Sequence, residues 1–278
     1  DGGVNWENVS SGLPKDYRVR RVIASAHIES RIYVALNGHT RDDFSSLLFV
    51  SNDYGKTWKK IGTNLPLEPI NVVREDPVNE NILYLGTDRN AYISLNGGNT
   101  FMLLSLDIPS VAVHDIAIQP DAKEIILATH GRSLYKGSIK EIQQLNEDLL
   151  KNNIHSFPLN EVKYSRVWGN SWSVWEEAPE YELSIPAYVN KAALINIRIY
   201  DENKNLLYSE HFQSSKAGLQ YNYYNLSVNE NLLNQLPEHE KKKYIRSKNN
   251  KFYLLPGKYM IEYELNGEKK QTQLIINK

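Results

Sequence analysis

The sequence predicts an all-β protein: a partial β-propeller of about two and a half to three blades, a linker helix, and an Ig-like or fibronectin-like β-sandwich. A turn motif that ends in an aromatic residue recurs along the first part of the chain, 52 residues from Asp1 to Asp53 and 43 from Asp53 to Asn96. Runs of alternating apolar and polar residues follow each copy, as expected of half-buried strands. Seven more such runs fill the last part of the chain. We therefore divide the chain into residues 1–138, 139–158 and 159–278.

The turn motif is best seen as SNDYGKTW at residues 51–58, with a weaker copy, SLNGGNTF, at residues 94–101 and a truncated one, DGGVNW, at residues 1–6. In such a turn an Asp or Asn side chain accepts hydrogen bonds from nearby backbone N–H groups, and Gly supplies a positive φ. We expect the closing aromatic side chain to pack beneath the turn. The motif thus predicts a structural role in a hairpin, with direct ion or ligand contact as the alternative. Its residues are Asp1, Gly3, Trp6, Ser51, Asp53, Gly55, Thr57, Trp58, Asn96, Gly98, Thr100 and Phe101.

This motif resembles the Asp-box of the bacterial-neuraminidase (BNR) repeat. The resemblance implies a β-propeller in which the motif joins the third and fourth strands of a blade, on the face opposite the usual ligand face. The pattern around the motif agrees, because each copy is followed by a Leu-Pro or Ile-Pro break and then by alternating strands. We expect these strands at residues 19–25, 31–36, 47–50, 70–74, 82–86, 91–94, 113–118, 124–129 and 134–136.

Beyond these repeats the pattern changes. Residues 139–150 carry apolar side chains at helical spacing without Pro or Gly, which predicts an amphipathic helix. Asn266-Gly267 predicts a type I′ hairpin turn, and residues 230–250, rich in Lys, Glu and Asn, predict a loop. The sandwich strands are expected at residues 162–168, 181–185, 194–200, 206–212, 219–226, 258–265 and 271–276.

Residues 129–135, THGRSLY, look like the segment that closes the propeller in bacterial sortilin/VPS10-like proteins of the BNR-repeat "glycosyl hydrolase" type, with Ser133 in place of the usual Gly. In that family a helix and a C-terminal Ig-like, FlgD-like module come next. AGLQY at residues 217–221 and LPGKY at residues 255–259 match that module. The resemblance covers nearly the whole chain, but the family label describes a repeat and not an active site.

The remaining blades are the first partner that we expect. A propeller ring typically has from four to about eight blades, and a partial ring exposes the apolar faces of its end blades. Because the chain begins inside a copy of the motif, we expect it to be the C-terminal part of a longer protein. Upstream residues of the same chain, or another chain, would then supply the missing blades.

Composition and charge argue against nucleic-acid binding, a membrane span and a metal or cofactor. The 32 basic and 33 acidic residues leave a net charge of −1, so no basic field indicates nucleic-acid binding. No run of 18 apolar residues is present, so we expect no direct membrane span. The chain has no Cys, and its seven His residues lack ligand spacing, so we expect no metal and no cofactor. The abundance of Asn, Lys and Tyr is typical of an extracytoplasmic, Bacteroidetes-like protein that is secreted, periplasmic or on the cell surface.

Three loops share one rim of the predicted propeller, and each offers Arg with Asp or His beside it. Such a cluster is able to bind carboxylates or hydroxyls. The ligand-binding candidates are His39, Arg41, Asp42, Asp43, Asp88, Arg89, His130 and Arg132. Structural alternatives stay open: solvated charge for the acidic residues of the first loop, an ion pair of Asp88 with Arg89, and hydrogen bonds of His130 and Arg132 to backbone carbonyls.

A second candidate is aromatic. Trp168, Trp172 and Trp175 lie within WGNSWSVW. They form either a platform on which sugar rings stack or a seal between sandwich and propeller.

Two functions follow. We favour a non-catalytic extracytoplasmic binding or scaffold protein whose sortilin-like propeller recognises a polypeptide or partner protein within a larger chain or cell-surface complex. The alternative is a glycoside hydrolase acting on a polysaccharide, or glycan, with its catalytic carboxylates mostly on the missing blades. A glycosidase needs two carboxyl groups about 5 to 10 Å apart. No such pair can be identified from the sequence, so we assign no catalytic residue.

Overall fold

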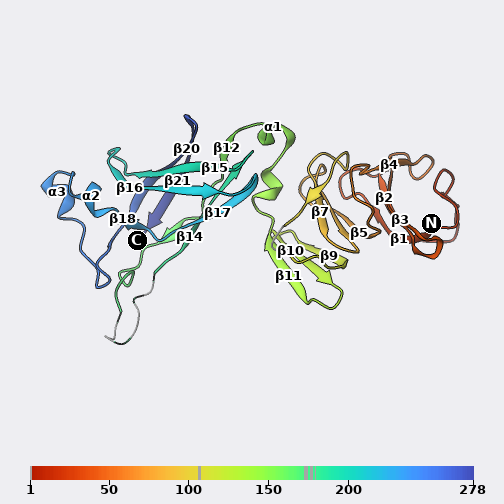
Figure 1. Cartoon of the computed structure of the whole chain (residues 1–278), viewed down its shortest axis with the longest axis horizontal. Helices are drawn as coiled ribbons and strands as arrows, with labels where there is room; N and C mark the ends of the chain where they lie inside the picture. Colours follow the sequence, from red (N-terminus) through yellow and green to blue (C-terminus); the bar gives the residue numbers. More distant parts are fainter. Residues whose placement is uncertain (1, 106–107, 172–174, 176–177, 179) are drawn as a thin grey trace. The chain divides into compact units, whose positions relative to one another are not determined.

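The computed structural model describes residues 2–105, 108–171, 175, 178 and 180–278. Strands dominate, which confirms the all-β prediction. The chain divides into two compact units, Asp1–Glu147 and Asp148–Lys278 (Figure 1). Each unit has a hydrophobic core of its own. No helix in the described ranges has the length and apolar character needed to cross a membrane.

Among the described residues, the first unit holds three antiparallel sheets, each made of strands that follow one another along the chain. The first strands of the three sheets are neighbours, with β1 against β5 and β5 against β9. Stacked meanders of this kind are typical of a propeller. The first sheet contains β1 (Arg18–Ala24), β2 (Ile32–Gly38), β3 (Asp43–Ser51) and β4 (Lys59–Ile61); the second contains β5 (Ile70–Glu75), β6 (Leu83–Thr87), β7 (Ala91–Ser94) and β8 (Met102–Leu103); the third contains β9 (Val113–Gln119), β10 (Glu124–Thr129) and β11 (Leu134–Ser138).

The core of the first unit lies between the first and second sheets. Tyr33 and Leu48 from the first sheet join Val73 and Leu85 from the second, and each is at most 1% exposed. Burying side chains of this size contributes about 1.5–3 kcal/mol each. The second strands, β2 and β6, are covered on both faces, which explains why they are nearly continuous apolar runs.

The turn at residues 51–58 is held by its own side chains. Asp53 Oδ1 accepts a hydrogen bond from the Thr57 N–H (2.9 Å), and Asp53 Oδ2 accepts one from the Thr57 hydroxyl (2.6 Å). The Ser51 hydroxyl accepts from the Gly55 N–H (2.8 Å), where φ is +87°. Trp58 is partly buried and its Nε1 donates to the Val9 carbonyl (2.8 Å), so the turn also fixes an N-terminal segment.

The other two copies of the motif differ. In the second copy Asn96 replaces the carboxylate: its Oδ1 accepts from the Thr100 N–H (3.0 Å), and Phe101 is 6% exposed in the core. In the first copy Asp1 lies outside the described residues, and Trp6 is 90% exposed with its Nε1 bonded to the Gly3 carbonyl (2.8 Å). The expected burial of Trp6 is therefore wrong.

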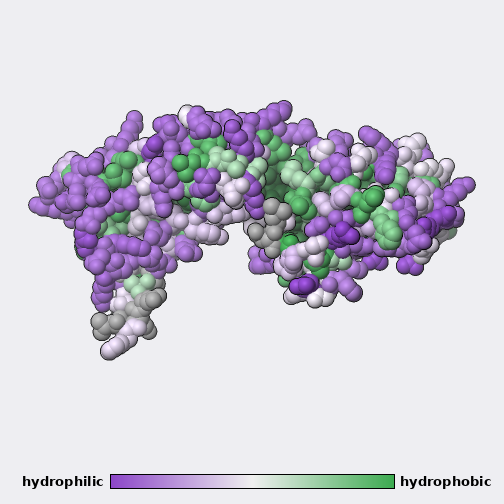
Figure 2. Space-filling view, in the orientation of Figure 1, coloured by the Kyte–Doolittle hydropathy of each residue, from purple (hydrophilic) through white to green (hydrophobic). Residues whose placement is uncertain are grey.

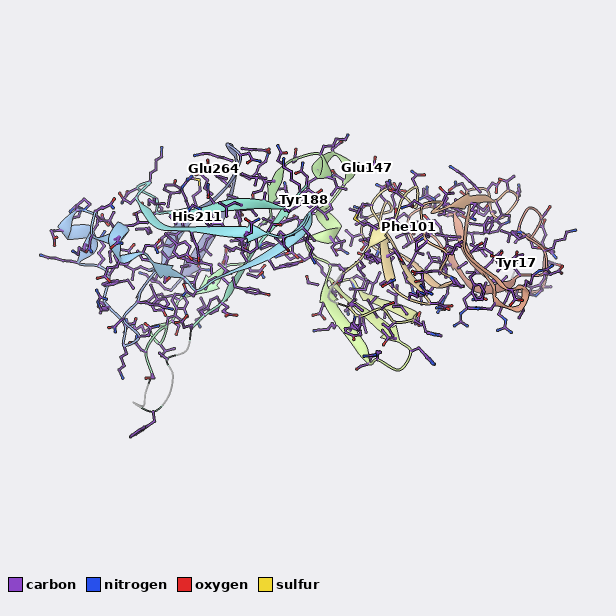
Figure 3. All side chains as sticks on the ribbon, viewed as in Figure 1. Tyr17, Phe101, Glu147, Tyr188, His211 and Glu264 are labelled. Atoms are coloured by element: carbon purple, nitrogen blue, oxygen red, sulfur yellow. The ribbon has the colours of Figure 1, made fainter. Side chains whose placement is uncertain are left out.

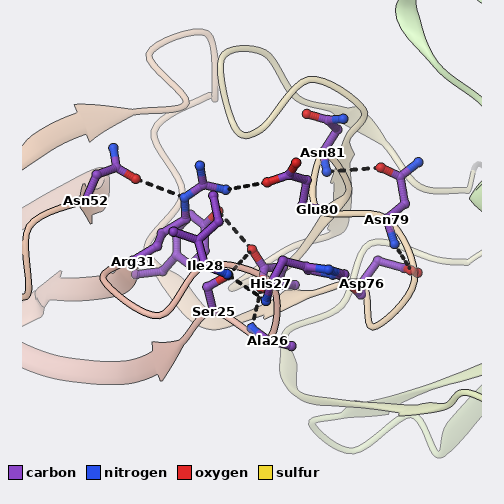
Figure 4. A network of polar contacts seen from close by, with 12 residues as sticks. Ser25, Ala26, His27, Ile28, Arg31, Asn52, Asp76, Asn79, Glu80 and Asn81 are labelled. Carbon is purple, nitrogen blue, oxygen red and sulfur yellow. Dashed lines mark hydrogen bonds and ion pairs between the residues drawn. The ribbon is translucent and has the colours of Figure 1, made fainter.

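A polar network joins the β1–β2 connection to the β5–β6 connection (Figure 4). Glu75 accepts from the Ser25 hydroxyl (2.9 Å) and from the Ala26 N–H (2.8 Å). Arg31 bonds Asn52 of the turn motif (2.9 Å) and pairs with Glu80 (3.4 Å). These contacts fix the first sheet against the second at one edge.

The buried side chain of Asp76 stabilises the same edge of the first and second sheets. It is fully buried and accepts hydrogen bonds from the Tyr84 hydroxyl (3.0 Å) and from the Val78 N–H (2.8 Å). Burial, together with the nearby Asp76 charge, raises the pKa of Tyr84. The Gln143 amide donates to both Asp76 oxygens, at 3.2 and 3.1 Å, and so ties the segment after the third sheet to the second sheet.

The helix expected over residues 139–150 is wrong as a single element. The segment instead holds two short helices, η2 (Ile142–Gln144) and α1 (Glu147–Leu150). Leu145 is extended, with φ −73° and ψ 142°, and it is buried, so its packing ends the first helical turn. Ile139 is fully buried and its N–H bonds the Lys123 carbonyl (2.8 Å) at the end of the third sheet.

In the part of the chain that the structure describes, the second unit has two larger sheets and one small strand pair. The three-stranded sheet has the order β12 (Ile154–Ser156), β14 (Leu183–Val189), β17 (Gly218–Tyr224). The five-stranded sheet has the order β13 (Val162–Lys163), β21 (Glu268–Asn277), β20 (Gly257–Leu265), β15 (Ala193–Tyr200), β16 (Leu206–Ser214). β18 (Ser227–Val228) pairs with β19 (Phe252–Tyr253).

Both sheets of the second unit share one core. Ile185 and Tyr224 of the three-stranded sheet lie in the same cluster as Ile197 and Ile261 of the five-stranded sheet. The Asn266-Gly267 turn has φ of 51° and 84° and joins β20 to β21, which confirms the predicted hairpin. The expected loop at residues 230–250 contains two short helices, α2 (Glu230–Leu233) and α3 (Glu238–Lys241).

Candidate functional site

A pocket of about 210 Å³ lies in the first unit, where its three sheets present polar side chains. The first strands of the three sheets supply half of its lining residues, and β2 together with the connections after β2 and β6 supplies the other half. Its lining residues are Arg18, Arg20, Asn37, His39, Thr40, Asn71, Asp88 and His114. We call this the rim pocket.

Local structure places the rim-pocket residues. The His39 N–H bonds Asn37 Oδ1 (2.9 Å) and starts a 3₁₀ turn, η1 (His39–Arg41). A Cβ at Gly38 would lie only 2.7 Å from the Asp43 carbonyl, so the strand can turn this tightly only with Gly. On the second sheet the Asp88 N–H bonds the Pro69 carbonyl (3.1 Å), which holds Asp88 beside β5.

A chain of polar contacts crosses the rim pocket. Asp88 Oδ2 lies 2.8 Å from His39 Nε2, and Asp88 Oδ1 accepts from the Asn71 amide (2.8 Å). Asn71 Oδ1 in turn accepts from Arg20 Nε (3.3 Å), and Arg20 also reaches His114 Nδ1 (3.1 Å). The single carboxylate among the described lining residues is thus shared by His39 and Asn71, while two guanidinium groups face the pocket.

Burial lowers the pKa of His114, and the neighbouring Arg20 and His130 side chains lower it further. Because a guanidinium can only donate, Nδ1 of His114 is the acceptor in the contact with Arg20. Arg18 and Arg20 each bring a permanent positive charge to the pocket.

The structure brings together only part of the predicted cluster. His39 and Asp88 are in contact, and His130 joins them indirectly, because its ring lies 5.2 Å from that of the pocket residue His114. The pairing considered for Asp88 and Arg89 is not the one observed, since Asp88 binds His39 and Asn71. The backbone N–H of His130 bonds the Ala112 carbonyl (2.9 Å).

The other candidates lie outside the lining of the rim pocket. Arg41 pairs with Asp16 (3.3 Å) and its guanidinium lies 5.7 Å from the centre of the Tyr17 ring. Asp43 accepts from the Tyr17 hydroxyl (2.8 Å), and hydrogen bonds from Ser45 and Tyr17 lower the pKa of Asp43. Asp42 adopts a left-handed conformation with φ 53°. The remaining candidates outside the lining are Arg89 and Arg132.

Sequence reasoning missed the lining that comes from the first strands of the sheets: Arg18, Arg20, Asn71 and His114. A signal was present. In β1 the alternation is broken by consecutive arginines, and the register with β2 shifts between Val19 and Arg21. A polar Asn inside the apolar run of β5 is a second signal, since buried amides need partners.

The described tryptophans of this segment differ in exposure. Trp168 is 6% exposed and is enclosed by aromatic residues of its own unit, with Tyr164 at 5.4 Å and Tyr181 at 5.8 Å between ring centres. Trp175 is 94% exposed, and Trp172 lies outside the described residues. Trp168 is therefore a core residue and cannot stack on a sugar.

Solved structures to which the chain is similar include glycoside hydrolases and a peptide-bound protein. A GH74 enzyme from Niastella koreensis is 12% identical to this chain. The match covers 92% of this chain and 38% of the enzyme, with a TM-score of 0.37. The GH74 xyloglucanase from Xanthomonas campestris is 10% identical with the same coverage, 92% and 38%, and a TM-score of 0.36. YCF48 bound to D1 peptide is 11% identical, with coverage of 93% and 67% and a TM-score of 0.30. The chain thus spans less than two fifths of the two enzymes.

No curated protein matches the chain. The family model described as sortilin, neurotensin receptor 3, matches residues 46–276, which include most of the first unit and nearly all of the second. A match over this much of the chain shows the family. The chain belongs to the Sortilin-Vps10 family of β-propeller proteins.

Proposed function

We propose that this chain is part of a non-catalytic, extracytoplasmic binding protein whose propeller recognises a polypeptide or a partner protein. The observation that carries the proposal is the charge of the rim pocket. Arg18 and Arg20 line it, while its one carboxylate in the described residues, Asp88, is already bonded to His39 and Asn71. A pocket of this kind suits an acidic group of the ligand, because guanidinium binds carboxylate through two parallel hydrogen bonds.

Further propeller sheets are the second part of the proposal. Val19 and Val22 of β1 are 55% and 54% exposed, and Leu134 of the third sheet is 67% exposed. Figure 2 shows apolar side chains reaching the surface of this unit between hydrophilic ones. Exposed apolar groups on the outer sheets support a complete ring made with sheets from the same polypeptide or from another chain. We propose an Ig-like topology and a spacer or docking role for the second unit.

Glycoside hydrolysis is the competing function. It needs an acid and a second carboxyl group across a cleft, about 5 to 10 Å apart. Among the described residues that line the rim pocket, Asp88 is the one carboxylate. Hydrolysis at this pocket would therefore require a further carboxylate from other sheets.

The test compares variants of the rim pocket in peptide binding. Arg18→Gln removes a guanidinium that faces the pocket, and Arg132→Gln removes one outside its lining. Binding of fluorescent peptides rich in Asp and Glu is measured by anisotropy, against the same peptides with Gln and Asn. We expect Arg18→Gln to weaken binding of the acidic peptides at least tenfold, about 1.4 kcal/mol, and Arg132→Gln to leave it unchanged.

The same preparations decide between the two functions. Equal affinity for acidic and amide peptides would contradict the charge-based recognition proposed here. Release of reducing sugar from a polysaccharide that disappears in Asp88→Asn would favour the hydrolase instead.

A further inference from the structure

A second pocket, also of about 210 Å³, lies in the second unit between β16 and β17. These strands are the outermost of their sheets, since β16 ends the five-stranded order and β17 ends the three-stranded one. Ile185 and Ile197 supply aliphatic side chains to the lining, and Tyr208, Glu210 and Phe212 come from β16. Figure 3 marks the place with His211, which lies on β16 and also lines the pocket. We call this the edge pocket.

Asn222 is the unusual residue of the edge pocket. It lies on β17 opposite Ile185, and its side chain is buried, with 6% exposed. Both its amide oxygen and its amide nitrogen are buried without a hydrogen-bond partner. Buried side-chain amides nearly always have partners, because leaving a donor and an acceptor unpaired destabilises the fold. Asn222 lines the edge pocket, so a bound group there would supply both missing partners.

The rest of the edge pocket combines rings with one carboxylate. The Tyr208 hydroxyl donates to Glu210, and the Tyr208 ring lies 4.6 Å from that of Tyr224. In the five-stranded sheet Glu210 lies directly opposite Ile197, another residue of the pocket lining. Tyr223, 65% exposed, stands at the mouth. The lining thus offers apolar ring faces, an amide and a carboxylate within one small space.

We propose that the edge pocket binds one neutral sugar residue. Neighbouring hydroxyls of a sugar each donate and accept, which matches the two unpaired atoms of Asn222, and a further hydroxyl can donate to Glu210. The C–H face of a sugar ring packs on aromatic side chains such as Phe212 or Tyr223. The carboxylate disfavours an acidic sugar. The volume is below the about 300–1,000 Å³ typical of drug-sized ligands, so it suits one ring rather than a long oligosaccharide.

This site is separate from the rim pocket and does not depend on the function proposed for it. Its residues all belong to the second unit, and those of the rim pocket all belong to the first. The protein would then recognise a glycan with one unit whatever the other unit binds.

The experiment titrates the whole chain with glucose, galactose, mannose, xylose and N-acetylglucosamine, each up to millimolar concentrations, and follows protein NMR shifts. Asn222→Leu replaces the unpaired amide by an apolar group of similar size. We expect it to weaken sugar binding at least tenfold while its Tm stays equal or rises, because no hydrogen bond is lost. Tyr223→Ala at the exposed mouth should also weaken binding, with no change in Tm.

Gln220→Leu is the matched control. Gln220 is on the same face of β17 and is 8% exposed, but its amide donates to the Lys216 carbonyl (3.1 Å) and lies outside the pocket lining. We expect it to lower Tm and to leave sugar affinity within twofold of that of the unsubstituted chain. If Gln220→Leu does not fold, Tyr223→Ala still tests the proposal.

Three results would overturn the assignment. One is that none of the five sugars shifts the resonances of the β16 and β17 residues. Another is that Asn222→Leu binds sugar as well as the unsubstituted chain does. The third is that butylamine or N-acetylglycine methylamide, probes of an amine and of a peptide group, binds the edge pocket when sugars do not.

Discussion

The carboxylate of Asp53 makes one turn of the first unit sensitive to acid. The Thr57 hydroxyl, then the Thr57 N–H and the Ser51 hydroxyl, lower the pKa of Asp53 to about 2. An Asp in an unfolded chain has a pKa of about 3.9. Because the folded pKa is the lower of the two, the stabilising effect of ionised Asp53 is present above about pH 4 and is lost as the pH falls toward about 2.

Asp53→Asn tests this directly. The amide oxygen can still accept from the Thr57 N–H, but an amide nitrogen cannot accept from the Thr57 hydroxyl as the carboxylate does. We expect a lower Tm at pH 7 and a weaker fall of Tm between about pH 4 and pH 2 than in the unsubstituted chain. Thermal unfolding followed by circular dichroism over this pH range gives both values. Asp42→Asn, in an exposed turn, is the control, and an identical pH profile for all three proteins would refute the role of Asp53.

Asp76 is the second residue with a large expected effect. Asp76→Ala removes the acceptor of the buried Tyr84 hydroxyl, the Val78 N–H and the Gln143 amide. We expect the free energy of unfolding to fall by about 3 kcal/mol or more, measured by urea denaturation. Glu80→Ala removes an exposed ion pair in the neighbouring network and should change it by less than about 1 kcal/mol. If both variants lost the same free energy of unfolding, burial of the Asp76 carboxylate would not explain its effect.

At the scale of elements, close approach between strands limits what the second sheet tolerates. A Cβ at Gly86 of β6 would lie 2.6 Å from the Val113 carbonyl of β9 and 2.7 Å from Val72 Cγ1. We expect Gly86→Ala to push the second and third sheets apart and to cost about 1–3 kcal/mol in urea denaturation. Gly137→Ala in β11 is the matched control, because its nearest neighbour is 4.0 Å away. A loss in Gly137→Ala as large as in Gly86→Ala would contradict crowding at Gly86 as the cause, because the entropy of the unfolded chain favours Ala over Gly.

Strand positions in the first unit could be predicted to within a few residues because apolar runs and Gly, Pro and Asn breaks recur with each copy of the turn. The helix over residues 139–150 could not, since apolar spacing alone does not show that Leu145 takes an extended conformation. The strand expected at residues 162–168 is only β13, two residues long, because Trp168 is packed among aromatic side chains instead. In both segments the conformation depends on packing against other parts of the fold, which the sequence pattern does not show.

The rim pocket was only half predictable for a related reason. Loops rich in charge are visible in sequence, so His39 and Asp88 were found. Arg20 and Asn71 lie on strands, and their role depends on which strands become neighbours in space. Asn222 illustrates the same limit, because a missing hydrogen bond has no sequence signature.

On the scale of the whole molecule, charge balance governs solubility. The net charge is −1 and the isoelectric point is near pH 6.7. With so little repulsion between copies, we expect self-association to be greatest near pH 6.7 and to decrease toward pH 8.5. Dynamic light scattering across this range measures it. Particle size that does not vary with pH would show that the exposed apolar residues of the outer sheets, and not charge, control association.

The contacts of the segment after the third sheet also determine how the first unit carries mechanical load. Gln143 is bonded to Asp76, and Glu147 accepts from Asn96 (3.1 Å), so two residues of this segment are tied to the second sheet or to the turn that follows β7. A pulling force applied to the chain beyond Glu147 is therefore transmitted to the second sheet, through a fully buried carboxylate. The third sheet is loaded as well, through the bond of the Ile139 N–H to the Lys123 carbonyl (2.8 Å), so the two sheets share the tension.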